Sequence, residues 1–180
     1  MLMFVPYWIF VGISPLLYMK GLGVSLSHFG YYQGSLALTF AVGSLLFGLI
    51  INRYDQRKLL SVANKIFILS FMTIMFVTFW NGSNPLLITL AFLPFVIGQI
   101  IPSNILYPLY LNLMPEAKGR LTALIQGGRL IFASIGLQIA GYFYNGSFHN
   151  IGIIVGSFVA AGTITMLFVL KQWSNIKSTG

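Results

Sequence analysis

The stretch Gly48-Leu49-Ile50-Ile51-Asn52-Arg53-Tyr54-Asp55-Gln56-Arg57-Lys58 decides the fold class of this chain. It places three cations and one of only two acids between two apolar runs. Each run is about 20 residues long, which is the length that an α-helix needs to cross a bilayer. A short basic turn between two such runs is typical of a cytoplasmic hairpin in a polytopic membrane protein.

The composition supports this interpretation. Of the 180 residues, 57% are hydrophobic and only 7% are charged, whereas a soluble domain carries about 25% charged residues. The net charge of +8 does not predict a nucleic-acid partner, because the ten cations lie in turns between apolar runs and form no basic face. The expected partner is the lipid bilayer, with the cations at its inner leaflet.

Metal, cofactor and enzyme chemistry have little support in the sequence. There is no cysteine, which excludes disulfides and thiol chemistry. His28 and His149 lie far apart without companion carboxylates, so no metal is expected. No phosphate-binding glycine loop, catalytic serine–histidine arrangement or paired carboxylate is present. We therefore expect no catalytic residue, no cofactor and no enzyme activity.

Hydropathy predicts an all-α membrane protein with six transmembrane helices in a bundle over 1–171, followed by a cytoplasmic tail at 172–180. Asn-Gly-Ser turns follow the third and fifth spans. The predicted spans are 2–19, 29–51, 60–80, 85–113, 120–144 and 150–171.

The distribution of cations predicts the orientation. Lys20 is the only cation on one side of the predicted topology, and Arg129 lies within a span. The positive-inside rule places the other side, with both termini, in the cytoplasm. The cations on that side are Arg53, Arg57, Lys58, Lys65, Lys118, Arg120, Lys171 and Lys177.

Small residues and prolines predict how the spans pack. The pairs Gly30/Gly34, Ser44/Gly48 and Gly152/Gly156 have the small-xxx-small spacing that lets helices approach closely in lipid. The fourth span contains three prolines, Pro94, Pro102 and Pro108, which predict a bent helix. That helix either lines a cavity or gate, or has a static kink that fits the bundle.

Arg129 is the strongest single candidate for a functional residue. It lies nine positions after Arg120, hence about 13 Å deeper along a helix. An arginine at that depth faces a bundle interior or a watery cavity, or it snorkels toward the cytoplasm. Gln126 lies one turn before it. Further substrate-cavity candidates are Gln99, Asn104 and Tyr107, although the two amides also fit a role as hydrogen-bonding links between helices.

The chain as a whole resembles the C-terminal six-helix half of a major facilitator superfamily transporter. The run from Phe4 to Phe10 is similar to the seventh helix of the Bcr/CflA (bicyclomycin and chloramphenicol resistance) drug:proton antiporters. The segment from Gly23 to Gly30 is similar to the loop that enters their eighth helix. The opening motif resembles a degenerate copy of the gating-loop signature of the superfamily. Its residues are Gly48, Asn52, Arg53, Asp55, Arg57 and Lys58, with Asn52 in place of the expected aspartate.

The resemblance implies a fold and a function. It implies a 3+3 repeat and one half of a proton-coupled multidrug or small-molecule efflux transporter that works by alternating access. The implied partners are an N-terminal six-helix half, or a second copy of the chain, and an amphipathic small-molecule substrate. The implied location is a bacterial inner membrane. The start at Met1 without a leader favours a fragment or a split gene.

Two alternatives remain open at this point. The chain could be an inactive remnant or a structural membrane protein, because no acid lies deep in any span and a proton-coupled carrier usually needs one. It could also be a half-transporter that pairs with itself.

Overall fold

The computed structural model describes residues 2–113 and 115–178, and every regular element in that part of the chain is helical. The predicted all-α class is therefore confirmed. The elements are η1 (Leu2–Phe4), α1 (Val5–Pro15), η2 (Leu16–Gly21), α2 (Leu26–Ile50), η3 (Ile51–Arg53), α3 (Gln56–Trp80), α4 (Pro85–Leu113), η4 (Pro115–Ala117), α5 (Lys118–Tyr142) and α6 (Phe148–Ser178).

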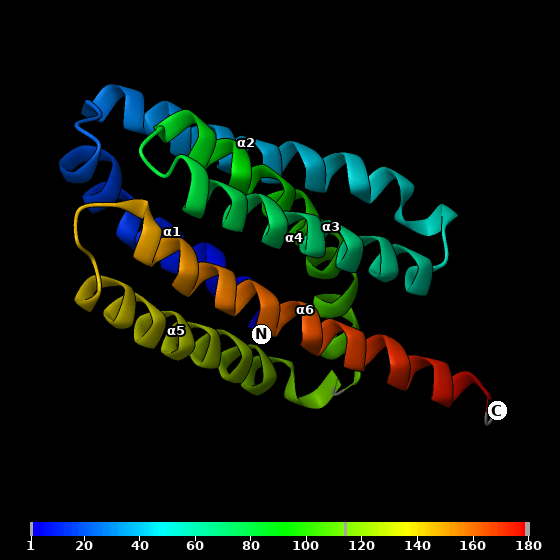
Figure 1. Cartoon of the computed structure of the whole chain (residues 1–180). Coiled ribbons are helices and arrows are strands. Elements are labelled where there is room, and N and C mark those ends of the chain that lie inside the picture. The colour runs from blue at the N-terminus through cyan, green and yellow to red at the C-terminus, as the bar shows by residue number, and fades with distance from the viewer. Residues whose placement is uncertain (1, 114, 179–180) are drawn as a thin grey trace.

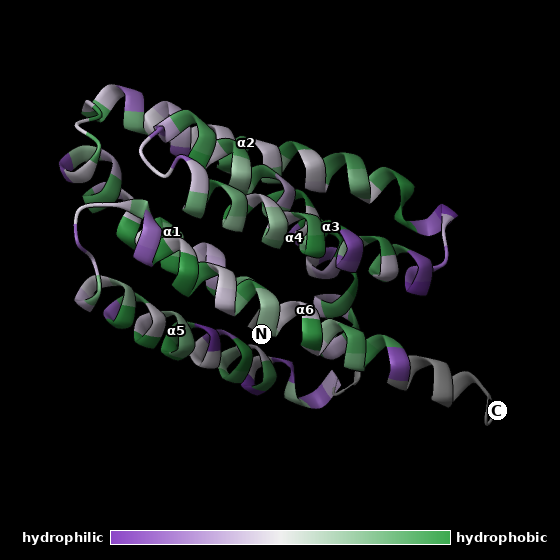
Figure 2. Cartoon of the chain, viewed as in Figure 1, coloured by the Kyte–Doolittle hydropathy of each residue, from purple (hydrophilic) through white to green (hydrophobic). Residues whose placement is uncertain are grey.

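Within the described ranges, five helices are long and apolar enough to cross a membrane: α2, α3, α4, α5 and α6. Each overlaps one of the last five predicted spans. The predicted tail 172–180 continues α6 as a helix through Ser178, and its last two residues lie outside the described part. Figure 2 shows hydrophilic residues gathered at the turns, as between α2 and α3, while the helices are mostly apolar.

The first predicted span, 2–19, differs from the others because it is not one α-helix. The α-helical part covers 11 residues in α1, and the chain then continues as the π-helical segment η2. Pro15 explains the change. Its missing N–H leaves the carbonyl of Val11 without its helical donor, and the Ser14 hydroxyl donates to that carbonyl at 2.8 Å instead.

The helices form a bundle in which α3 packs against α4 and α6, α2 packs against α4, and α1 packs against α5 and α6. Figure 1 shows α2 along one edge of this bundle and α5 along the other. Buried apolar side chains such as Phe10, Phe92 and Phe148 fill the centre. The two edge helices contribute little to it, since only 11% of the apolar window of α2 and 17% of that of α5 are buried.

Glycines separate the packed faces from the open ones. A methyl group added at Gly152 would overlap the side chain of Thr78, and one at Gly156 would overlap Met75. The predicted pair Gly152/Gly156 thus brings α6 close to α3. The pair Gly30/Gly34 on α2 has the same spacing, but a methyl group added at either glycine would meet nothing within 4 Å.

Hydrogen bonds tie the helices together at the end where the chain turns near 81–84 and 145–147. The hydroxyls of Tyr18 and Thr89 lie 2.8 Å apart, and the Tyr144 hydroxyl donates to the carbonyl of Leu16 at 3.2 Å. Gly146 adopts a φ of +90°, which favours glycine, in the turn before α6. One end of the bundle is thereby held by contacts between helices that are distant in sequence.

The two glycine pairs give a stability prediction. We expect Gly152→Leu to destabilise the bundle by about 1–3 kcal/mol, because the larger side chain overpacks the α3–α6 contact. Gly34→Leu should leave the stability of the isolated chain unchanged or slightly raised, since it fills open space and improves helix propensity. Thermal unfolding in detergent measures both, and equal losses in the two variants would contradict this packing.

The orientation is testable because the chain has no cysteine. Gln56 and Ser83 are exposed, at opposite ends of α3. If the basic turns are cytoplasmic, Ser83→Cys should react with a membrane-impermeant maleimide in intact cells. Gln56→Cys should react only after the cells are permeabilised. The reverse pattern would overturn the predicted orientation.

Candidate functional site

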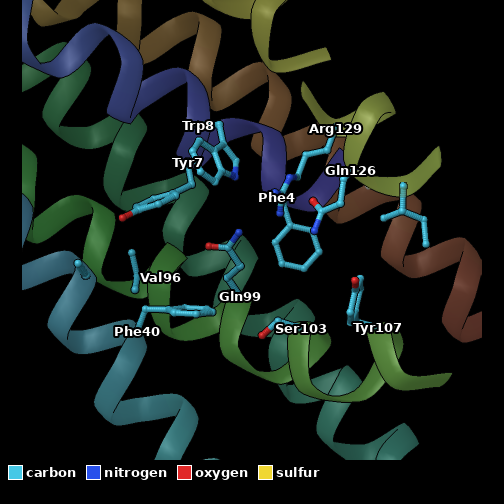
Figure 3. A pocket seen from close by; sticks show the side chains of 12 residues that line it. Phe4, Tyr7, Trp8, Phe40, Val96, Gln99, Ser103, Tyr107, Gln126 and Arg129 are labelled. Carbon is cyan, nitrogen blue, oxygen red and sulfur yellow. The ribbon is translucent and has the colours of Figure 1, made fainter. Parts of the chain in front are cut away.

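A cavity of about 400 Å³ lies between α1, α2, α4 and α5 (Figure 3). Its wall combines aromatic rings with a small group of polar side chains, which is the usual character of a small-molecule site. The lining residues are Phe4, Tyr7, Trp8, Ala37, Phe40, Val96, Gln99, Ser103, Tyr107, Ile125, Gln126 and Arg129.

Arg129 lies over the indole ring of Trp8, with its Cζ atom 5.1 Å from the ring centroid. The close packing of α1 on α5 sets this distance. A methyl group added at Gly136 of α5 would overlap the side chain of Ile9, the neighbour of Trp8 in sequence. The cation–π contact is worth about 0.5–2 kcal/mol. A charged side chain at the centre of a membrane helix costs about 2.5–3.5 kcal/mol. The contact alone therefore does not offset the cost of placing Arg129 at this depth.

Two polar atoms next to the cavity are buried without a hydrogen-bond partner among the described residues. They are Nε of Arg129 and Oε1 of Gln126. Gln99 is only 5% exposed and lines the same cavity, and Figure 3 shows its amide pointing toward the side of the cavity where Trp8 lies. Because buried polar groups are rarely left unpaired, these side chains define the polar centre of the cavity.

A second cavity of about 480 Å³ adjoins the first and shares Phe4, Tyr107 and Ile125 with it. Its wall is almost wholly apolar, and the hydroxyl groups among its lining residues belong to Tyr107, Tyr110 and Thr165. The remaining lining residues are Met3, Pro102, Leu106, Tyr110, Leu121, Phe132, Met166 and Val169. The two cavities together form a polar compartment at Arg129 and an apolar compartment beside it.

The predicted cavity residues divide into two groups. Arg129, Gln126, Gln99 and Tyr107 line the first cavity. Asn104 does not. Its Nδ2 donates to the carbonyl of Ile100 at 2.8 Å and lies 3.5 Å from the hydroxyl of Ser44 on α2. Asn104 therefore acts as a link between α4 and α2, which is the other role that its sequence position allowed.

Sequence reasoning missed the aromatic part of the wall. Tyr7 and Trp8 lie near the start of the first predicted span, where aromatic residues usually form an interfacial belt. Both line the cavity instead, together with Phe4 and Phe40. One signal was available: Trp8 lies six residues inside the first span, about 9 Å from its start, which is deep for an interfacial residue. The pairing of Trp8 with Arg129 depends on how α1 packs against α5, and no local pattern encodes that contact.

The basic turn is an exposed connection between α2 and α3. Gly48 lies on α2 and Arg53 ends η3. Asp55 caps α3, with its Oδ1 accepting a hydrogen bond from the backbone N–H of Arg57 at 2.8 Å. The side chains of Asn52 and Lys58 are exposed as well. The one acid of this turn thus has a structural task, and a gating role of the turn stays a prediction.

A helical membrane protein with an aromatic and polar cavity between its helices has the general form of a membrane transporter. The sequence matches the family described as Major Facilitator Superfamily over residues 1–175, and the chain belongs to that superfamily. Members of this superfamily are membrane transporters. This chain is therefore an integral membrane protein with a role in membrane transport. Comparison with curated proteins and with solved structures gives no significant match.

The cavity predicts a pattern of chemical accessibility. Ser103 lines it, whereas Ser70 on α3 is fully buried. We expect Ser103→Cys to react readily with the small polar reagent sulfonatoethyl methanethiosulfonate in the folded protein, and Ser70→Cys to react only on unfolding. Labelling followed by mass spectrometry gives both rates. Equal rates at the two positions would contradict a water-accessible cavity at Ser103.

Proposed function

We propose that this chain is the C-terminal six-helix half of a major facilitator superfamily transporter. In this proposal a second six-helix body completes the cavity at Arg129, and the pair moves an amphipathic small molecule across the membrane by alternating access. The observation that carries the proposal is the position of the cavity: it lies between the two edge helices α2 and α5 and the inner helices α1 and α4.

The open face of α2 supports a helical partner. Small residues recur along it at alternating spacings of four and three, which keeps them on one side of the helix. All of them are exposed except Ser44, which is half-buried. Such a strip favours the close approach of another membrane helix. Its residues are Gly30, Gly34, Ala37, Ala41, Ser44 and Gly48.

The open face of α5 supports the same conclusion with polar groups. Ser134, Gln138 and Gly141 follow one another at spacings of four and three, and all three are exposed in the structure. An amide such as that of Gln138 is costly to leave in hydrocarbon without a hydrogen-bond partner. Covering this face with protein or water removes that cost.

The contact pattern supports a 3+3 repeat. If α1 corresponds to α4, α2 to α5 and α3 to α6, each main contact has a counterpart. The packing of α2 on α4 corresponds to that of α5 on α1. The packing of α3 on α4 corresponds to that of α6 on α1 and η1. The packing of α3 on α6 joins the two equivalent third helices and is its own counterpart. The first predicted span is then the continuous run of η1, α1 and η2 from Leu2 to Gly21, which extends about 30 Å at helical rise and completes a set of six.

The finer assignment rests on the sequence. The resemblance of residues 4–10 and 23–30 to the Bcr/CflA antiporters favours proton-coupled efflux of drugs or other small molecules from a bacterial cytoplasm. The distribution of cations favours cytoplasmic termini in the inner membrane. Asp55 and Glu116 are the only acids and both are exposed at helix starts. In this proposal the proton-binding carboxylate therefore belongs to the partner half.

A second copy of the chain is the alternative partner. The strip of small residues on α2 and the polar face of α5 are both open on one molecule, so two copies can cover each other's open faces. Crosslinking in native membranes separates the two cases. A product of twice the mass of the chain indicates self-pairing, and a product with a different six-helix protein indicates an N-terminal half. Recovery of the monomer alone would contradict both forms of the proposal.

Transport is tested by producing the chain in cells with and without the reading frame upstream of its gene, and measuring retention of fluorescent amphipathic compounds. The proposal predicts lower retention only when both are present. Gly34→Leu should abolish this effect by blocking the α2 strip, because the glycine faces open space in the chain itself. Val62→Leu, which enlarges an exposed side chain on α3, is the matched control and should have no effect.

The opposite outcomes are informative. Equal retention with and without the pair, for every compound tested, would count against transport and favour the inactive remnant. Full activity of Gly34→Leu would show that α2 does not contact the partner.

A further inference from the structure

The charge of the cavity limits which molecules it can favour. Arg129 is a cation, and none of the lining residues of either cavity is acidic. The whole sequence contains only Asp55 and Glu116 as acids, and both are exposed at helix starts rather than at the cavity. The positive charge of Arg129 is therefore not neutralised by an acidic side chain of this chain.

The geometry around Arg129 leaves its hydrogen-bond donors available. Arg129 lies over the indole ring of Trp8, with 5.1 Å between Cζ and the ring centroid. The buried Nε of the guanidinium has no hydrogen-bond partner among the described residues. A planar fork of donors matches the two oxygens of a carboxylate or a similar oxyanion.

Two amides extend this donor set. Gln99 is buried and turned into the cavity, and Gln126 lies one helical turn from Arg129. Rotation of an amide group exchanges its oxygen for its NH₂, so the unpartnered end of Gln126 can present donors to the same anion. Three neutral or cationic donor groups then line one cavity, and none of its lining residues is a carboxylate.

The adjoining apolar cavity accounts for the rest of the ligand. It begins at Phe4, Tyr107 and Ile125, which it shares with the polar compartment, and continues past Pro102 and Leu106. Burial of an aromatic or alkyl group there is favourable because it removes apolar area from water. A molecule that fills both compartments has an anionic head and an apolar body.

We propose that the substrate of this site is an amphipathic organic anion, with its carboxylate or equivalent oxyanion held by Arg129, Gln126 and Gln99 and its apolar body in the adjoining cavity. This inference rests on the transport function proposed above. It narrows the substrate class from amphipathic molecules in general to those that carry a negative charge.

The test uses three matched probes that each carry a butyl group at position 4 of the ring. They are the carboxylate anion 4-butylbenzoate, the neutral amide 4-butylbenzamide and the cation 4-butylbenzylammonium, and the position number is omitted below. The full chain with Ser103→Cys is placed in phosphatidylcholine nanodiscs and treated with the uncharged reagent methyl methanethiosulfonate. We expect butylbenzoate to slow the reaction, and the other two probes to need about 10- to 100-fold higher concentrations, because they lack a charge-assisted hydrogen bond to Arg129.

Variants assign this preference to one residue. Arg129→Gln should remove the advantage of butylbenzoate over butylbenzamide, and Arg129→Lys should restore part of it. Arg120→Gln removes an exposed cation from the start of the same helix and should leave the preference unchanged. Unaltered protection by butylbenzamide in Arg129→Gln shows that the variant is folded.

Several outcomes would overturn the proposal. They are equal protection by the three probes, protection by none of them, and a preference for the carboxylate that survives in Arg129→Gln. An anionic phospholipid has the same head chemistry, so nanodiscs with phosphatidylglycerol form a separate arm. Protection by phosphatidylglycerol without protection by butylbenzoate also contradicts the proposal. The paired halves could instead export neutral or cationic compounds in a way that Arg129→Gln does not change. That result would overturn the proposal of an anionic substrate and leave the proposal of a transporter intact.

Discussion

The full positive charge of Arg129 within a membrane helix is the constraint on which the site depends. Hydrocarbon cannot solvate it, and the contact with Trp8 supplies only part of the cost of its position. The charge is therefore tolerable only beside a polar cavity. α1 supplies the indole, α4 supplies Gln99 and α5 supplies the cation itself. The small residues that bring these helices close, such as Gly136, are as necessary to the site as the polar side chains.

Lipid as solvent also explains the division of the bundle into packed and open faces. Without a hydrophobic driving force between helices, close packing depends on small residues and interhelical hydrogen bonds. On α6 the glycines are used within the chain, against Thr78 and Met75. On α2 the glycines at 30, 34 and 48 meet no neighbour, and on α5 the amide of Gln138 is exposed. The same chemistry thus occurs on surfaces that the chain does not cover itself, and Ala37 of the α2 strip also lines the cavity.

Much of the fold was predictable from the sequence, because the hydrophobic runs and the turn residues are local signals. Five long helices overlap the predicted spans, and the family match confirms the superfamily. The π-helical end of the first span was not predicted, since a run of apolar residues does not distinguish α-helical from π-helical hydrogen bonding. Arg129 was identified by its depth alone. The roles of Trp8 and Asn104 could not be separated in advance, because each depends on which neighbouring helix its side chain meets.

In the proposed transporter, protein rather than lipid covers the face of α2 that flanks the cavity. Spin labels at Ala41 on α2 and at Leu69, an exposed residue on α3, measure this through collisions with molecular oxygen, which concentrates in the bilayer interior. The measurement is made in membranes of cells that also express the upstream reading frame. If a partner covers α2, oxygen accessibility is low at Ala41 and high at Leu69. Equal, high accessibility at both positions would contradict it.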